Sequence, residues 1–145
     1  TDAAQVLAEM AGKAGLKIKV RRVPSDGYWK NTWLKVPWCG ATWYGRPTAV
    51  MMLNLAYSSG AAWNESHWRN PSFDALLTEA SGTLDHAKRK QLLCEAQWML
   101  HNDGNTLIPS FVDWVDAHST KVKGINPHPD LYMGSLHWND IWLDS

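Results

Sequence analysis

The histidines are the first residues to consider, because imidazole serves both as a metal ligand and as a proton carrier. Their spacing forms no HxxxH or HExxH pattern, and none of them pairs locally with a cysteine. We therefore expect no metal site and no cofactor. The six histidines are His67, His86, His101, His118, His128 and His137.

The sequence also lacks a convincing catalytic group. Ser110 and Asp113 lie near His118, but Pro109-Ser110-Phe111 is not the glycine-flanked turn that exposes a nucleophile. The offset between Ser110 and Asp113 is odd, so a strand would point the two side chains to opposite faces. No glycine-rich motif that could hold phosphate is present. We expect that the protein is not an enzyme.

Tryptophan dominates the aromatic residues, with 10 Trp against 4 Tyr and 2 Phe. Two glycine-containing loops, 40–46 and 58–70, mix aromatic rings with a few polar groups, as the lining of a small-molecule cleft usually does. For each residue alone, an ordinary core ring or a solvated polar group stays an open alternative. The candidate ligand-binding residues are Trp43, Tyr44, Arg46, Trp63, Asn64 and His67.

Length and charge limit the classes of protein to consider. The 145 residues balance 14 Lys and Arg against 14 Asp and Glu without a basic block, so we expect no nucleic-acid partner. No apolar stretch approaches the ~20 residues of a membrane span. The chain begins at Thr1 with no signal peptide, which indicates a processed or excised piece. Cys39 and Cys94 are interpreted as two small buried hydrophobic residues, with an isolated disulfide as the alternative.

The periodicity of the apolar residues predicts the elements that must position the two loops. Helical spacing predicts helices at 3–14, 28–33, 49–57, 71–80 and 85–103. Alternating or short apolar runs predict strands at 16–20, 35–39, 107–112 and 138–143. Thr48 and a residue near Asp85 are expected to cap helices, and Gly104 to end one. This mixture predicts an α/β or α+β fold.

Several short motifs follow one another along the chain. Residues 4–20 are similar to the pattern Q-x-x-L-x-x-x-G-I-x-V, and residues 68–77 to Y-x-N-P-x-F-D-x-L-L. Four further segments follow the same order: Trp38-Cys39 leading to Pro47, Asp85 to Lys90 with Gln97, Ile108-Pro109, and Val122-Lys123-Gly124. Together they resemble the extracytoplasmic solute-binding proteins of peptide-type ABC importers (family 5, the dipeptide- and oligopeptide-binding proteins).

The resemblance implies an α/β fold of the periplasmic-binding-protein type II, in which two lobes close on the ligand. Residues 1–110 would form most of the second, carboxy-terminal lobe, and residues 111–145 a return segment that completes the first lobe. It also implies a periplasmic or other extracytoplasmic location, a small-molecule or peptide ligand, and delivery to an ABC permease in the membrane. With half of the cleft absent, this chain alone should bind ligand weakly or not at all.

The segment after Trp38-Cys39 departs from the family pattern. Peptide-binding members carry an aspartate there for the ligand's ammonium group, whereas residues 40–46 are two residues longer and contain no acid. We hypothesise that the ligand presents no free peptide amino terminus to this segment, because a buried ammonium without a counter-charge is costly. Arg46 could instead hold a carboxylate or another anion, although an ordinary salt bridge is an equal alternative.

Two other classes of protein remain open. A tryptophan-rich carbohydrate-binding module would stack its rings on sugars and would fold as an autonomous, β-rich domain. A structural or interaction domain would use exposed rings as a partner interface. A far-UV circular dichroism spectrum with little helix would favour the carbohydrate-binding module.

Overall fold

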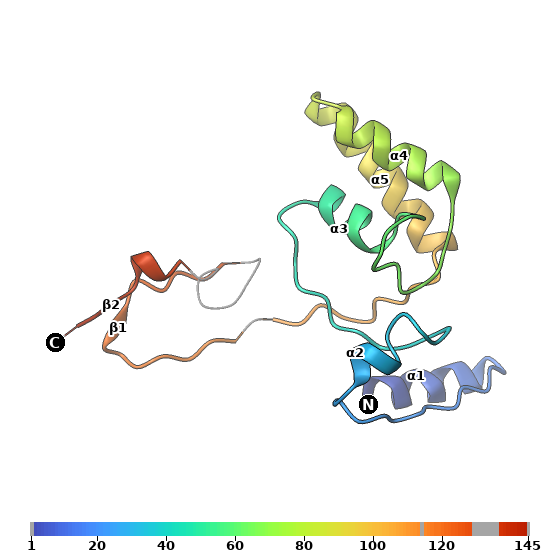
Figure 1. The fold of residues 1–145 in the computed structure, drawn as a ribbon, viewed down its shortest axis with the longest axis horizontal. Helices are drawn as coiled ribbons and strands as arrows, with labels where there is room; N and C mark the ends of the chain where they lie inside the picture. Colours follow the sequence, from blue (N-terminus) through green and yellow to red (C-terminus); the bar gives the residue numbers. More distant parts are fainter. Residues whose placement is uncertain (1, 114, 129–136, 145) are drawn as a thin grey trace. The chain divides into compact units, whose positions relative to one another are not determined.

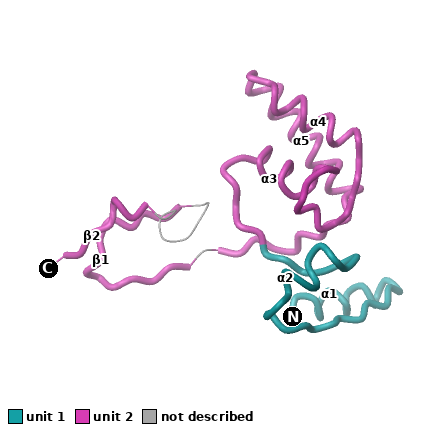
Figure 2. The backbone as a smooth tube through the Cα atoms, in the orientation of Figure 1, with its two compact units in different colours: residues 1–42 teal, residues 43–145 magenta. Residues whose placement is uncertain are grey.

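A computed structural model of the chain describes residues 2–113, 115–128 and 137–144. The chain forms two compact units, residues 1–42 and residues 43–145, coloured separately in Figure 2. The elements are labelled in Figure 1. They are α1 (Asp2–Lys13), α2 (Tyr28–Asn31), α3 (Ala49–Ala56), α4 (Pro71–Gly82), α5 (His86–Asp103), β1 (Val122–Lys123), the 3-10 helix η1 (Trp138–Asp140) and β2 (Trp142–Leu143).

Unit 1 carries α1 and α2. An acidic Asp2 in the first turn of α1 and a basic Lys13 in its last turn complement the helix dipole. Gly15 follows with φ +85°, a left-handed conformation that glycine adopts without steric cost, and the helix ends as the sequence predicts. No residue of α1 is buried within the described structure, so this helix gains little from packing.

The α-helices α3, α4 and α5 of unit 2 begin at capping side chains. Thr48 Oγ1 accepts a hydrogen bond from Met51 N at 3.4 Å, and Asp85 Oδ1 accepts one from Lys88 N at 2.7 Å. Both caps are predicted correctly. Asn70, which the sequence did not single out, caps α4 by accepting from Ser72 N and Phe73 N at 3.0 and 3.2 Å. Pro71 then occupies the first turn, where a missing N–H costs nothing.

Three of the predicted strands are wrong for the described residues. Residues 16–20 and 107–112 have no regular secondary structure, and residues 35–38 form a turn and bends rather than a strand. Alternation shows that a segment could cover one face of a sheet, but a strand forms only beside a hydrogen-bonding neighbour. The strand expected at 138–143 is reduced to β2, which pairs antiparallel with β1 through Val122 opposite Leu143 and Lys123 opposite Trp142. The described chain is therefore mostly helical with a two-stranded sheet, and the expected α/β lobe is not confirmed.

The cysteines do not form the disulfide that was kept as an alternative. Both are free thiols; Cys39 is partly buried and Cys94 is exposed on α5. The interpretation as buried hydrophobic residues is therefore wrong for Cys94. Among the described residues, no helix has both the length and the apolar character that a membrane crossing requires.

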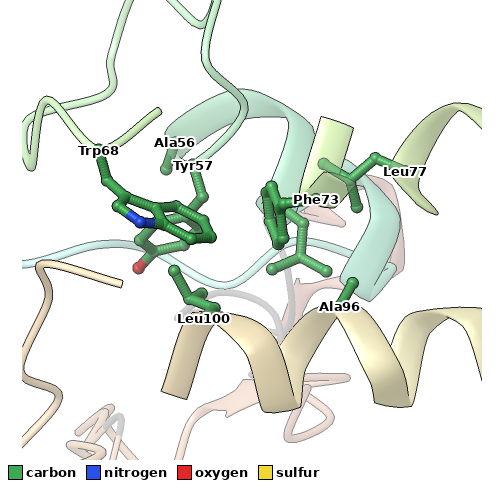
Figure 3. Packing of buried hydrophobic residues seen from close by; sticks show 8 residues of the cluster. Ala56, Tyr57, Trp68, Phe73, Leu77, Ala96 and Leu100 are labelled. Carbon is green, nitrogen blue, oxygen red and sulfur yellow. The ribbon is translucent and has the colours of Figure 1, made fainter. Parts of the chain in front are cut away.

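The hydrophobic core lies in unit 2, where α4 packs along α5 and α3 packs on α4. Each helix contributes a stripe of apolar residues spaced three or four apart, such as Phe73, Leu77 and Ala80 on α4. Phe73 lies at the centre with 0% exposure, and its ring meets Trp68 edge-on with centroids 4.9 Å apart (Figure 3). The cluster consists of Leu53, Ala56, Tyr57, Trp68, Phe73, Leu77, Ala96 and Leu100.

The two phenylalanines of the chain give a matched test of this core. Phe73→Ala should lower the free energy of unfolding by about 3–5 kcal/mol, because it removes a fully buried ring and leaves a cavity. Phe111→Ala is the control, since that side chain is 93% exposed and its loss should change stability by at most about 0.5 kcal/mol. Urea unfolding followed by circular dichroism measures both. Equal effects of the two substitutions would contradict this core.

Candidate ligand-binding site

The six candidate residues lie on two segments of unit 2, one on each side of α3 in the sequence. Residues 43–46 precede α3, and residues 58–70 connect α3 to α4. The longer loop is tied to the start of α4 at both of its ends. Ser59 N donates to Asp74 Oδ1 at 2.9 Å, and Asn70 N donates to Ser59 Oγ at 3.1 Å. Its ends are therefore positioned by the packed helices that they join.

Trp43 and Trp63 come together although they belong to different segments of the sequence. Their rings are tilted by 52° with centroids 5.9 Å apart. The indole Nε1 of Trp43 donates a hydrogen bond to Glu65 Oε1 at 2.9 Å. Trp63 is 44% exposed, so one side of this group is open to a solute. The contact between the two indoles, one of which is hydrogen-bonded to a carboxylate, is the feature of the predicted site that the structure assembles most clearly.

Asn64 is buried and cross-links the two ends of the loop through its side-chain amide. Its side chain is 7% exposed, and Nδ2 donates to the backbone carbonyls of Ser58 at 3.2 Å and Trp68 at 2.7 Å. Its Oδ1 accepts from Ser66 Oγ at 2.9 Å. These bonds join the two ends of the loop and satisfy backbone groups that no helix or sheet could pair. The amide therefore fixes the loop conformation from within.

Trp68 turns inward as well, and it anchors the loop to the end of α5. The ring belongs to the hydrophobic core and is 6% exposed (Figure 3). Its Nε1 donates to Asp103 Oδ2 at 3.2 Å, and Asn70 Nδ2 contacts the same oxygen at 3.4 Å. A carboxylate at a helix C-terminus is unfavourable for the helix dipole, and these two donors offset that cost.

His67 adopts a strained backbone conformation. Its φ is +55°, in the left-handed region that residues other than glycine rarely occupy. His67 N donates to Asn64 O at 3.2 Å, so the same turn that Asn64 braces holds the strained residue in place. The side chain is exposed. Strain of this kind persists only where the surrounding structure overdetermines the backbone.

Tyr44 and Arg46 occupy the shorter segment. Tyr44 is 50% exposed, and Arg46 is partly buried. Arg46 Nη1 donates to the carbonyl oxygens of Tyr44 and Gly45, at 2.9 Å each. The ion pairs of the described residues do not include Arg46, so the ordinary salt bridge considered for it is not formed there. The guanidinium is thus hydrogen-bonded to the backbone of its own segment, and it has further N–H donors beyond Nη1.

Tyr57, at the end of α3, is the group in this region whose ionisation is clearly perturbed. The pKa of its phenol is raised, first because burial disfavours the charged phenolate and second because the carboxylate of Glu65 repels that charge. Its ring is part of the core in Figure 3. Glu65 in the loop therefore interacts electrostatically with Tyr57 at the edge of the core.

Stability should fall at high pH because of Tyr57. The folded state holds the phenol proton more tightly than the unfolded state, whose pKa is near 10.0, so the free energy of unfolding decreases as the pH rises above that value. In Tyr57→Phe this contribution is absent, and the decrease should be smaller. Urea unfolding at about pH 8 and about pH 11 measures the difference. Identical pH dependence in both proteins would contradict the assignment.

Removal of the Asn64 amide should loosen the loop. Asn64→Ala leaves buried backbone carbonyls without donors, which should cost about 1–3 kcal/mol of stability. Asn105→Ala is the control, because Asn105 is exposed and should matter by no more than about 0.5 kcal/mol. Thermal and urea unfolding of the two variants provide the comparison. A neutral Asn64→Ala would show that the loop does not depend on this brace.

The described residues offer little to a metal ion. They contain no group of three or more His, Cys, Asp or Glu side chains arranged to hold one. A hollow in the C-terminal segment is lined by residues 124–128, His137, Asp140 and Ile141, and none of the six candidate residues lines it.

Glu65 and Asp103 are polar residues of this region that are not among the six candidates. Glu65 is visible in the sequence as an acid two residues after Trp63, but its position against Trp43 depends on contact between separate segments. Asp103 reads as the end of a helix, and its bonds to Trp68 and Asn70 follow only from the fold. The spacing of the residues alone carries no signal for either contact.

The comparisons with known proteins relate this chain to peptide-binding proteins. The chain is a distant, partial homologue of the family 5 peptide-binding proteins, and the relatives it matches are binding proteins rather than enzymes. It is similar to the dipeptide-binding protein DppE of Bacillus subtilis, with 31% identity over 85 residues, which cover 59% of this chain and 16% of DppE. It is also similar to the periplasmic oligopeptide-binding protein OppA.

The OppA proteins of Salmonella typhimurium and Escherichia coli are each 27% identical over 105 residues, which cover 69% of this chain and 18% of OppA. The chain therefore spans about a sixth of the length of these relatives. No family model matches the chain, and no solved structure matches it. The resemblance found in the sequence motifs is confirmed, whereas the ligand-binding residues stay predictions.

Proposed function

We propose that this chain is part of an extracytoplasmic solute-binding protein that captures a small polar solute and delivers it to an ABC permease in the membrane. The solute is peptide-like or a non-peptide anion, and the location is periplasmic. The observation that carries the proposal is the homology to DppE and OppA, whose names describe dipeptide and periplasmic oligopeptide binding. The two indoles beside a carboxylate supply a surface suited to such a solute.

The proposed architecture is a lobe of a two-lobed α/β protein. Residues 1–110 would form most of the second lobe, and residues 111–145 would return to complete the first. The extended segment around residue 110 supports a buried role in a larger assembly, because large apolar side chains there face water. Phe111, Val112 and Val115 are 93%, 79% and 88% exposed. Ligand capture would then proceed by closure of the two lobes, since a ligand that touches both stabilises the closed state.

The proposed roles of the six site residues follow from their positions. Trp43, Tyr44 and Trp63 would offer ring surface, and Asn64 would hold the loop that presents Trp63 and the exposed His67. Arg46 would hold a carboxylate or another anion. Its partial exposure and its unused N–H donors support that role.

The carbohydrate-binding alternative is not favoured. A β-rich module needs sheets to carry its rings, whereas the described residues form helices and one short two-stranded sheet. The use of exposed rings as a partner interface stays open as a second class, and it is distinguished by the ligand titration below.

Dialanine is a suitable first probe because it carries both a carboxylate and an ammonium group. We expect weak, roughly millimolar binding, visible in ¹H–¹⁵N NMR spectra as shifts of the Trp43 and Trp63 indole N–H signals. The Trp98 indole, on α5 and 69% exposed, should not shift. Shifts of equal size at all exposed indoles would contradict a ligand site here.

The role of Arg46 has its own test in the same titration. Arg46→Ala should weaken dialanine binding about tenfold, because a charge-assisted bond to the carboxylate is lost. Arg69→Ala is the matched control, since Arg69 is an exposed arginine of the 58–70 loop. Dialanine affinity that survives Arg46→Ala would show that Arg46 does not hold the anion.

A further inference from the structure

We propose that the outer face of α5 is a docking surface for a second copy of this chain, which packs its own α5 against it in the antiparallel direction. The inference goes beyond the proposed function and does not depend on it, because none of the six candidate ligand-binding residues lies on α5. The outer face of α5 consists of five exposed residues: Ala87, Gln91, Cys94, Trp98 and His101.

This outer face lies opposite the face of α5 that packs in the core. The buried residues of the helix are Leu92, Ala96 and Leu100. At 100° per residue, the centre of the outer face lies about 180° around the helix from the centre of these three residues. No residue of the outer face belongs to the core cluster of the described residues. One side of α5 is therefore buried in unit 2, and the other side is exposed to solvent.

The outer face has the composition and the spacing of a contact between helices. None of its residues is Lys, Arg, Asp or Glu, although the exposed face of a helix usually carries such charges. Trp98 is 69% exposed and stacks on His101, with ring centroids 5.7 Å apart and planes inclined by 27°. The five residues follow one another at alternating intervals of four and three, which is the repeat by which two helices pack side by side.

The sizes of the side chains favour the antiparallel direction. In a parallel pair, the two Trp98 rings would meet at one level and the two Ala87 methyl groups would leave space at another. In an antiparallel pair centred between Gln91 and Cys94, Trp98 of each copy lies opposite Ala87 of the other, so that a large side chain meets a small one. The antiparallel direction also brings opposite ends of the two helix dipoles together.

The charges beside the outer face complement one another in the same arrangement. Lys88 and Glu95 are both exposed and flank the same edge of the face, one toward each end of α5. In the antiparallel pair, Lys88 of each copy lies next to Glu95 of the other, which gives two ion pairs across the contact. Lys88 Nζ lies 2.7 Å from Glu79 Oε1 of its own copy, so its ammonium group would be placed between two carboxylates.

The expected dimer is weak. The 18 residues of α5 form a helix about 27 Å long, and one face of such a helix buries less area than a standard protein interface. The formal net charge of the chain is zero, so two copies approach each other without net repulsion. We expect a dissociation constant of about 100 μM.

Sedimentation equilibrium of the whole chain tests the dimer and the role of Trp98. The measurement spans about 10 μM to about 1 mM, to either side of the expected dissociation constant, in a reducing buffer that prevents a disulfide between Cys94 residues. Trp98→Ala should weaken dimerisation about tenfold or more, because an aromatic residue at the centre of a contact contributes strongly to binding. Trp38→Ala is the matched control, since Trp38 is 51% exposed and lies in unit 1.

A pair of charge reversals tests the antiparallel direction. Lys88→Glu and Glu95→Lys should each weaken dimerisation, because each places like charges next to one another twice. An equimolar mixture of the two variants should dimerise again, since every glutamate at these positions then lies next to a lysine of the other copy. Circular dichroism of each variant verifies that α5 stays folded, because Lys88→Glu also removes the ion pair with Glu79.

Three outcomes would overturn the inference. The first is a chain that stays monomeric over the whole concentration range. The second is a dimer that persists in Trp98→Ala and is lost in Phe111→Ser, which would assign self-association to the exposed segment around residue 110. The third is a mixture of the two charge variants that dimerises no better than either variant alone. Each of these leaves the proposed function standing, because the ligand titration follows Trp43 and Trp63.

Discussion

Phe73 and Leu77 of α4 pack against Ala96 and Leu100 of α5, and the other features of unit 2 depend on this apolar contact. It buries Phe73 completely and leaves the start of α4 at a defined place beside the end of α5. Because α3 joins the same core, the 58–70 loop begins and ends on packed helices. A loop of this length without regular structure can hold a defined conformation only under such a constraint.

Hydrogen bonds from polar side chains fix the conformation of the 58–70 loop between the packed helices. Backbone amides and carbonyls that no helix or sheet can pair need other partners, and the side chains of Asn64, Ser59 and Asp74 supply them. Asp103 accepts from both Trp68 and Asn70, so the loop is bonded to α5 as well as to α4. With the inner side occupied by these bonds, Trp63 and His67 are left on the outer side, where the backbone strain at His67 is sustained.

Local features of the sequence predicted the helices well. Thr48, Asp85 and Gly104 mark helix ends through short-range capping, and apolar spacing marked the buried faces of α4 and α5. The predicted strands at 16–20 and 107–112 failed because their alternation says nothing of a pairing partner. The same limit applies to Trp68: its residue type suggested a cleft, whereas its ring and N–H are used by Phe73 and Asp103.

The sequence by itself determined the relationship to the peptide-binding proteins, the helical segments with the caps Thr48 and Asp85, and the loops that carry the exposed rings. Only the tertiary structure decided that Asn64 braces the loop and that Glu65 meets Trp43. The physical reason is distance along the chain. Capping and helical periodicity act within a few residues, whereas the environment of a carboxylate or a buried amide depends on segments brought together by the core.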